Sequence, residues 1–577
     1  MSEAVALLRA REQSAKYLTQ MDDPLIRGFE LLATASDGVA KFRELIISLA
    51  VQGKLVRQNR TEEPATALLH RIAEAAGRSM PSARVEIGLT GWERVTFGDY
   101  ATALCTGPFG SLIGKDEYVD GGVPLVNPSH MKNGRIEAQS NISVKPAKAI
   151  ELRAYALTAG DIVFARRGEV GRTALVTEIE EGWLCGTGSF FARFHPDIDR
   201  SYLQMLFNSR SMREYLGREA VGATMVNLNQ RVLLNARIDV PPLAEQHRIV
   251  ARVEELMKLC DALEQNGRLA DEQHARLTST LFDALATSES AHALAENWKR
   301  VAGHFDLLLD RPEAIDRLEQ AILDLAVRGC LVFQDAAEEP ATELLTQIRL
   351  EKARLISEGK IKRDKSVSII TEEETPYELP AGWAWARLGQ LLTKIGAGST
   401  PLGGKDVYTT TGIKFLRSQN VWNDGLRLTN VAFILPSTHS TMSGTVVQSN
   451  DLLFNITGAS IGRCAVVPAE FDEANVSQHV TIIRPAVAAT RHFLHLVLMS
   501  KKIQQTVQDV QVGVSREGLS IAKLGQFVIP VPPLAEQHRI VTRVEELRRL
   551  CADLRQRLTQ AQETQSRLAD ALVAEIG

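Results

Sequence analysis

The stretch VPPLAEQHRIV occupies Val240–Val250 and occurs again, letter for letter, at Val531–Val541, 291 residues later. The likeness continues into the following residues, because the windows Leu243–Leu263 and Leu534–Leu554 differ at only five positions. This period is far longer than the roughly 20–50 residues of a solenoid unit. The repeated unit is therefore a whole domain with its adjoining helix.

A second repeated segment lies upstream of each copy. FELLATASDGVAKFRELIISLAVQGKLV covers Phe29–Val56, and FDLLLDRPEAIDRLEQAILDLAVRGCLV covers Phe305–Val332. Apolar residues recur in both at helical spacing and a glycine follows them, which predicts a helix with a glycine C-cap. EEPAT then follows in each copy and predicts another short helix with proline in its first turn.

Two blocks of equal length lie between these repeats, from Trp92 to Pro241 and from Trp383 to Pro532. Their sequences diverge but keep register, as GDIVFARRGEVGRTALV at 160–176 and NDLLFNITGASIGRCAVV at 450–467 show. Short β-like runs broken by Gly and Asn, followed by helical stretches, predict an α+β domain in each block. We expect two homologous domains with one framework and different surfaces.

A long helix is predicted after each VPPLAEQ. From Ile249 and from Ile540, apolar residues step by four and three over several heptads, the pattern of a coiled coil. Two such helices in one chain most simply pair with each other, antiparallel. The expected fold is thus α+β: two homologous α/β domains, separated and joined by two long α-helices in an antiparallel coiled coil, with a pseudo-two-fold internal repeat. The expected parts are a helical segment at 1–90, a domain at 91–242, a long helix at 243–290, a helical segment plus charged linker at 291–381, a domain at 382–533 and a long helix at 534–577.

Composition and charge bound the class of protein. Hydrophobic residues make up 45% of the 577 and charged residues 24%, as in soluble globular proteins. There is no apolar run of about 18 residues and no signal-peptide pattern at the start, so we expect a cytoplasmic protein without a membrane segment. The net charge is −4, but residues 382–531 carry 13 basic and eight acidic side chains, whereas residues 91–240 carry 17 of each. The second block is therefore the more basic, as a DNA-facing surface can be.

The cysteines point to neither a metal site nor disulfides. The six cysteines show no CxxC spacing, which favours reduced thiols over a zinc site or disulfide framework. Cys260 and Cys551 occupy equivalent heptad positions and are expected to be small core residues.

The layout as a whole resembles the DNA-specificity subunits of type I restriction-modification systems. The resemblance rests on LAVQGKLV and LAVRGCLV, GWE and GWA, and PPLAEQHRIV twice before heptad helices, and it runs from about Phe29 to the end. It implies two target-recognition domains, each reading one half of a bipartite double-stranded DNA target. It also implies that the helices act as a ruler and dock two modification (methyltransferase) subunits, which restriction (ATP-dependent translocase/nuclease) subunits join. S-adenosylmethionine, ATP and Mg would then belong to those partner subunits, and this chain would hold no cofactor or metal.

Catalytic motifs are missing from the sequence. A P-loop needs GxxxxGK[ST], but the nearest strings, GSLIGKD at 110–116 and GSTPLGGKD at 398–406, have the wrong spacing and end in aspartate. NPSH at 127–130 lacks the second proline and the aromatic residue of an amino-methyltransferase pocket. We therefore expect a non-catalytic subunit. Two alternatives stay open: a single-chain methyltransferase-nuclease, and an adaptor whose recognition domains are degenerate.

The candidate DNA-reading residues lie in polar or basic loops at matching positions of the two blocks, with side chains that suit base edges or phosphates. In the first block they are Asn127, Ser129, His130, Lys132, Arg166 and Arg167. In the second they are Arg417, Ser418, Gln419, Asn420, Asn423, Gln478, His479, Ser515 and Arg516. An identical polar turn at both helix starts suits two identical partners, so the candidate docking residues are Glu245, Gln246, His247 and Arg248, and Glu536, Gln537, His538 and Arg539.

Overall fold

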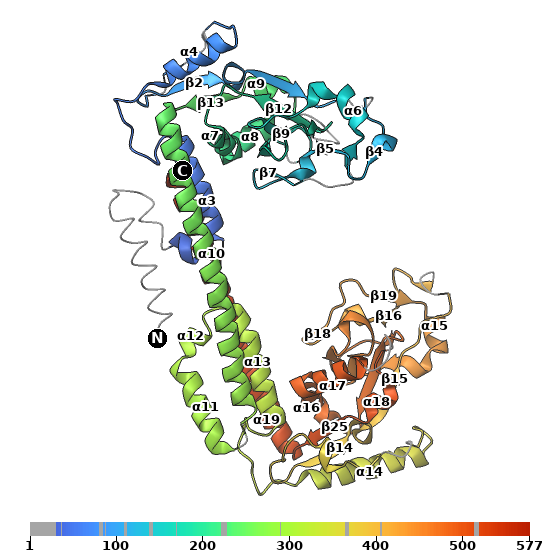
Figure 1. Cartoon of the computed structure of the whole chain (residues 1–577). Helices are drawn as coiled ribbons and strands as arrows, with labels where there is room; N and C mark the ends of the chain where they lie inside the picture. The colour runs from blue at the N-terminus through green and yellow to red at the C-terminus, as the bar shows by residue number, and fades with distance from the viewer. Residues whose placement is uncertain are drawn as a thin grey trace. The chain divides into compact units, whose positions relative to one another are not determined.

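The computed structural model describes residues 31–35, 37–79, 85–86, 88–108, 112–137, 142–168, 170–220, 228–288, 290–363, 368–403, 407–512 and 518–576. The chain forms two compact units, residues 1–269 with 562–577, and residues 270–561. Each unit contains one large mixed domain and parts of the two long helices, α10 (Leu243–Ala286) and α19 (Leu534–Ile576) (Figure 1).

The domain of the first unit is closed by pairing of a strand near its start with its last strand. β2 (Glu93–Thr96) runs antiparallel to β13 (Arg237–Val240). The main sheet has the order β10-β9-β12-β3, formed by Thr173–Leu175, Ile162–Ala165, Ser189–Arg193 and Ala103–Thr106. All four residues of β9 are buried, because other strands and helices cover both faces of the sheet. Phe97, Phe164 and Phe207 meet edge to face at 4.9–5.6 Å in its core.

A smaller sheet adjoins the main one in the first domain. Its order is β11-β5-β8-β4, formed by Leu184–Cys185, Val123–Val126, Ser143–Val144 and Tyr118–Val119. The other elements of this unit are α3 (Gly38–Val51), α4 (Ala65–Ala75), β1 (Val85–Glu86), α5 (Phe97–Tyr100), β6 (Met131–Lys132), β7 (Arg135–Ile136), α6 (Pro146–Glu151), α7 (Arg200–Asn208), α8 (Arg210–Glu219) and α9 (Gln230–Leu234).

The domain of the second unit repeats this plan. β14 (Ala384–Arg387) pairs with β25 (Val528–Val531), as β2 does with β13. The main sheet has the order β22-β21-β24-β15, formed by Cys464–Val466, Leu452–Asn455, Val480–Pro485 and Leu392–Ala397. The smaller sheet has the order β19-β16-β23-β20, formed by Ala432–Ile434, Ile413–Leu416, Ala474–Val476 and Val446–Val447. In both smaller sheets one central strand has a parallel and an antiparallel neighbour, which confirms that the two blocks share a framework.

The second unit has further helices and one strand hairpin. They are α11 (Ala291–Gly303), α12 (Phe305–Leu308), α13 (Pro312–Val327), α14 (Ala341–Ser357), β17 (Val421–Trp422), β18 (Gly425–Leu426), α15 (Pro436–Thr441), α16 (Arg491–Met499), α17 (Lys501–Val512) and α18 (Ile521–Gly525).

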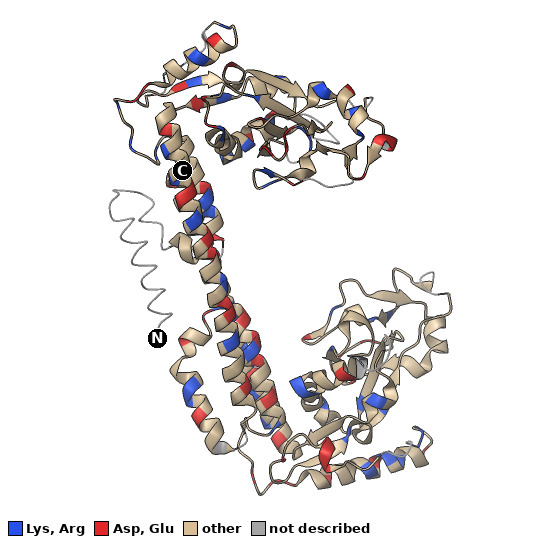
Figure 2. Ribbon diagram, in the orientation of Figure 1, with Lys and Arg blue, Asp and Glu red and all other residues tan. Residues whose placement is uncertain are grey.

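Within the first unit, the start of α10 and the end of α19 pack together with α3. Ile249 and Leu256 of α10 share a core cluster with Leu45 of α3 and Ala569 of α19. Acidic and basic residues recur along these helices (Figure 2). Arg43 of α3 pairs with Asp261 and Glu264 of α10, whereas Lys41 on the same helix pairs with Asp570 of α19.

Within the second unit, the end of α10 and the start of α19 pack in the same way with α13. Phe282 and Leu285 of α10 share a cluster with Ile322 of α13 and Val544 of α19. Each unit thus joins opposite ends of the two helices, the arrangement of an antiparallel pair, and the predicted fold class is confirmed. In each unit, the repeated upstream segment contributes a third helix that packs on the two long helices, because its apolar stripe needs burial. The sequence had predicted a coiled coil of the two long helices alone.

Cys260 and Cys551 are both buried in these helical clusters, and burial raises the pKa of each thiol to about 11. Among the residues that the structure describes, no helix combines the length and apolar character needed to cross a membrane.

Candidate nucleic-acid interface

A tight turn carries the first group of candidate residues in the first domain. It runs through Pro128–His130 into the β6–β7 hairpin. The backbone N–H of Asn127 donates to Nδ1 of His130 at 3.3 Å, and the carbonyl of His130 accepts from the N–H of Glu137 at 2.7 Å. His130 is 1% exposed, and burial lowers its pKa. His130 therefore braces the turn and does not fit the predicted role of base contact, since its ring faces the protein interior.

The second domain has the same turn built from different side chains. The N–H of Arg417 donates to Oδ1 of Asn420 at 3.0 Å, and the carbonyl of Asn420 accepts from the N–H of Arg427 at 2.9 Å. Asn420 also donates from Nδ2 to the carbonyl of Arg427 at 2.8 Å. Asn420 is buried, so its predicted role of base contact is corrected in the same way as that of His130.

The remaining candidates on the turns differ in exposure. Ser129, Lys132 and Arg167 are exposed in the first domain, as are Gln419, Asn423, Gln478 and His479 in the second. Asn127, Arg166, Arg417 and Ser418 are half-buried. Ser515 and Arg516 lie outside the described residues. The exposed candidates are the side chains able to reach a partner.

Hydrogen bonds bring the predicted loops of the first domain together. Arg172 donates from Nη1 to the carbonyls of Met131 at 3.0 Å and Pro128 at 3.4 Å, which ties the loop after β9 to the turn. The N–H of Arg166 donates to the carbonyl of Gly188, and the carbonyl of Arg166 accepts from the N–H of Leu228, both at 2.9 Å. The loops at 127–137, 165–172 and 186–189 thus share one edge of the domain.

The second domain assembles its loops with corresponding bonds. The N–H of Ile456 donates to the carbonyl of His479 at 3.0 Å, and the carbonyl of Ile456 accepts from Leu519 at 2.8 Å. Asn455 donates from Nδ2 to the carbonyl of Ser418 at 2.9 Å, and Thr457 shares a 2.6 Å hydrogen bond with the His479 ring. The residue types differ between the domains while the backbone frame is kept.

Three residues of the second domain escaped the sequence analysis. The guanidinium carbons of Arg427 and Arg463 lie 3.7 Å and 3.8 Å from the ring centre of Trp422. These three residues were missed because the candidates were chosen as side chains that can hydrogen-bond to bases, and cations stacked on an indole ring do not meet that criterion. The available signal was a tryptophan within a polar loop.

The turns at the starts of α10 and α19 are locked within the chain. Gln246 and Gln537 donate from Nε2 to the carbonyls of Pro241 and Pro532 at 2.9 and 3.0 Å. Arg248 pairs with Glu62, and Arg539 pairs with Glu338, so each turn is tied to its EEPAT segment.

The docking prediction does not fit the four buried side chains of these turns, which are Glu245, Gln246, Glu536 and Gln537. Each is at most 1% exposed and is enclosed by its own unit. His247 and His538 are exposed, and Arg248 and Arg539 are half-buried.

Comparison with known proteins bears on the whole layout. The family model described as type I restriction modification DNA specificity domain matches residues 90–271 and 380–563. The chain belongs to this family of specificity subunits. The specificity subunits of this family are non-catalytic, which agrees with the expectation of a chain that is not an enzyme.

The alignments with similar proteins cover nearly the whole specificity subunit. It is 30% identical over 562 residues to the EcoAI type I restriction enzyme specificity subunit of Escherichia coli, with 93% of both chains covered. It is 28% identical over 573 residues to the EcoEI specificity subunit of the same species, again with 93% of both covered. A chain from a solved structure on complex assembly of the type I restriction-modification system is 18% identical, with a TM-score of 0.43 and coverage of 84% of this chain and 97% of that one.

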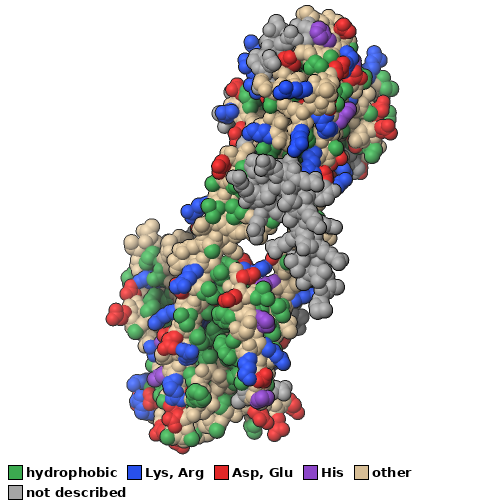
Figure 3. Space-filling model, turned by 90° about the vertical axis from the view of Figure 1, so that its left-hand side faces the viewer, with side chains coloured by type: hydrophobic (Ala, Val, Ile, Leu, Met, Phe, Trp, Pro, Cys, Tyr) green, Lys and Arg blue, Asp and Glu red, His purple; other side chains and the backbone are tan. Residues whose placement is uncertain are grey.

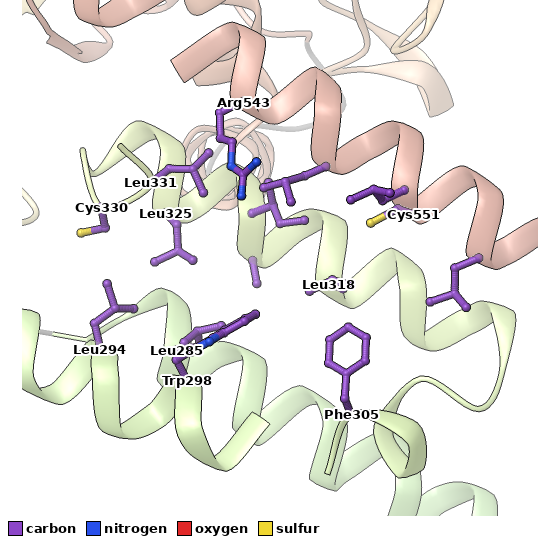
Figure 4. Close-up of a pocket in the computed structure, with 15 residues that line it drawn as sticks. Leu285, Leu294, Trp298, Phe305, Leu318, Leu325, Cys330, Leu331, Arg543 and Cys551 are labelled. Carbon is purple, nitrogen blue, oxygen red and sulfur yellow. The ribbon is translucent and has the colours of Figure 1, made fainter. Parts of the chain in front are cut away.

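The second unit of the specificity subunit also has an apolar pocket of about 440 Å³. Hydrophobic side chains gather over this face (Figure 3). Trp298 and Phe305 lie across the pocket from Leu318 and Cys551, and Arg543 of α19 points toward it (Figure 4). Trp298 is half exposed, so apolar surface is open to a partner here.

Proposed function

We propose that this specificity subunit reads a bipartite double-stranded DNA target, one half with each recognition domain. The observation that carries the proposal is the pair of corresponding turns. Ser129 and Gln419 are exposed at the same position of turns that share their backbone hydrogen bonds. One frame with different exposed side chains is what two domains need in order to read different base sequences.

The proposal extends to the partner subunits. His247 and His538, with Ala244 and Ala535, are exposed at equivalent positions of identical turns. The same surface therefore occurs twice, which favours two copies of one partner, the modification subunit. The apolar pocket with the exposed Trp298 is a further surface for a protein partner. S-adenosylmethionine, ATP and Mg are then expected in the modification and restriction subunits, and the complex in the cytoplasm.

Mapping of methylated adenines in genomic DNA tests the proposal. Single-molecule sequencing would compare the source strain with a strain that carries an early stop codon in this gene. We expect one split N6-methyladenine motif to disappear, and the motif would give both half-sites.

A second measurement is needed if the restriction-modification system is not expressed in the source strain, because the pattern of methylated adenines would then not change. Purified specificity subunit with its modification subunits would be incubated with a pool of random duplexes. Enrichment of a split motif supports the proposal. A stable complex without any sequence preference would contradict it and favour the adaptor.

A further inference from the structure

The corresponding hairpins of the two recognition domains carry different side-chain pairs. In the first domain, Lys132 of β6 and Glu137 after β7 form an ion pair of 2.6 Å. The residues at these positions in the second domain are Trp422 and Arg427, and the guanidinium carbon of Arg427 lies 3.7 Å from the indole ring centre. A neutral ion pair is thus replaced by a stacked cation.

A second arginine completes this stack. Arg463 lies 3.8 Å from the same ring centre. Two guanidinium groups this close to one ring centre would overlap on a single face, so they must lie on opposite faces of Trp422. The result is an Arg427–Trp422–Arg463 sandwich at the edge of the second domain.

The two arginines have little that neutralises them. Arg172, the counterpart of Arg463 in the first domain, donates to the carbonyls of Pro128 and Met131. No hydrogen bond or ion pair of the Arg463 guanidinium occurs within the described part of the chain. Among the described residues, the Arg427 guanidinium pairs with Asp424 alone, at 3.4 Å, and both of these side chains are more than half exposed. An exposed pair of this kind contributes little and is easily exchanged for another anion.

The sandwich adjoins the turn that carries exposed candidate residues. The indole Nε1 of Trp422 donates to the carbonyl of Gln419 at 2.9 Å, which fixes the ring against the turn. Stacking holds a guanidinium plane in place while its N–H groups still point outward in the plane, ready for bidentate bonding to an anion. The position and the free donors together match a site for the anionic backbone of a nucleic acid bound at this edge.

We propose that the Arg427–Trp422–Arg463 sandwich binds phosphates of the DNA backbone and that it makes a salt-dependent contribution to DNA affinity through a stack that the corresponding hairpin of the first domain does not form. The inference rests on the proposed DNA-binding function. Phosphate contacts position a protein without reading sequence, so the sandwich contributes affinity and register but not base preference.

Binding measurements over a range of salt concentrations test the proposal. The full chain with its modification subunits would be titrated with a labelled 40-base-pair duplex of random sequence and with a duplex that carries the methylation motif. For Arg427→Gln and for Arg463→Gln, the slope of log affinity against log salt should fall by about one. Each variant should then lose about fourfold less affinity than the wild type between 50 and 200 mM salt. The base preference at both half-sites should not change.

Two further variants separate positioning from charge. Trp422→Leu keeps both arginines, and we expect it to lower affinity for both duplexes because the guanidinium groups are no longer held. The matched control is Arg354→Gln with Glu351→Gln, which removes an exposed ion pair of α14, outside the recognition domains, at constant net charge and should keep the wild-type salt slope. Thermal unfolding would check that each variant is folded. If Arg463→Gln does not fold, the salt slope of the more exposed Arg427→Gln tests the proposal.

The outcomes distinguish this inference from the proposed function. A wild-type salt slope in folded Arg427→Gln and Arg463→Gln would mean that the sandwich is only structural, and the inference would be wrong. Loss of base preference with an unchanged slope would also overturn it, since the arginines would then read bases. If the wild-type complex binds neither duplex, the proposed function itself fails.

Discussion

The indole nitrogen of Trp383 donates a 3.0 Å hydrogen bond to a carboxylate oxygen of Glu536, 153 residues further along the chain. The other carboxylate oxygen accepts from Gln334 at 3.1 Å. Both Trp383 and Glu536 are buried. The GW and PPLAEQ motifs of the second half are thus joined by buried hydrogen bonds. Gln58, Trp92 and Glu245 occupy the corresponding sequence positions of the first half.

Loss of the Glu536 carboxylate should weaken the second unit. In Glu536→Ala the buried Trp383 N–H loses its acceptor, and an unsatisfied buried donor costs about 1–3 kcal/mol. Burial raises the pKa of Glu536, against the opposing hydrogen bonds from Gln334 and Trp383, so the carboxylate depends on those two donors. Denaturant unfolding measures the loss. Glu545→Ala, on the exposed side of the same helix, should change stability by less than about 0.5 kcal/mol, and equal effects of the two substitutions would refute this role of the Glu536 carboxylate.

His495 should make the second domain sensitive to mild acid. Its Nε2 lies 2.9 Å from the carbonyl of Cys464, and burial lowers its pKa from 6.5 to about 4. Between these values the unfolded chain binds a proton that the folded chain does not. The stability is therefore complete above about pH 6.5 and is lost as the pH falls toward 4.

The corresponding measurement compares the wild type with His495→Asn. From pH 7.5 to pH 5, the wild-type free energy of unfolding should fall by about 2 kcal/mol more than that of the variant. The variant loses the pH-dependent part because asparagine does not titrate. Parallel pH curves for the two proteins would show that His495 is protonated equally in the folded and unfolded chains.

The repeats predict the architecture because segments that match in register adopt the same backbone fold in both halves of the chain. Two equal blocks with matching fragments require two similar domains, and heptads from Ile249 and Ile540 require helices with an apolar stripe. The third helix in each unit follows from the same periodicity in Phe29–Val56 and Phe305–Val332, but its partner cannot be derived from spacing alone. Only tertiary packing decides that α3 and α13 each cover the long helices.

Side-chain roles were harder to predict, because the sequence does not reveal partners that are distant along the chain. A glutamate in the first turn of a helix is usually exposed. Glu536 is instead buried, and its carboxylate accepts hydrogen bonds from side chains 153 and 202 residues earlier in the chain. His130 and Asn420 have the chemistry of base contacts, but each closes its own turn through a backbone N–H three residues earlier. Polar residue type alone does not distinguish a side chain that reads DNA from one that shapes the loop.

Substitutions at the centres of the two turns should affect one half-site each. Ser129 and Gln419 are both exposed and occupy the same turn position. Gln419→Ala should relax base preference in the half-site of the second domain by about 1–3 kcal/mol at one position, because a side-chain amide can bond an adenine edge. Ser129→Ala should act on the other half-site only. Selection from random duplexes reads both effects, and a change in both half-sites from one substitution would contradict independent reading.

The long helices should set the spacing between the half-sites. At 1.5 Å per residue, the 44 residues of α10 extend about 66 Å, and one heptad accounts for about 10 Å, the rise of about three base pairs. Removal of residues 265–271 together with 556–562 takes one heptad from each helix and keeps the apolar stripes in phase. We expect the complex to select a split motif with a shorter central spacer and unchanged half-sites. Three base pairs also turn the duplex by about 100°, whereas a heptad barely turns the helix, so the new spacer must be found by selection from random duplexes. An unchanged spacer in a folded, DNA-binding variant would show that the helices do not act as the ruler.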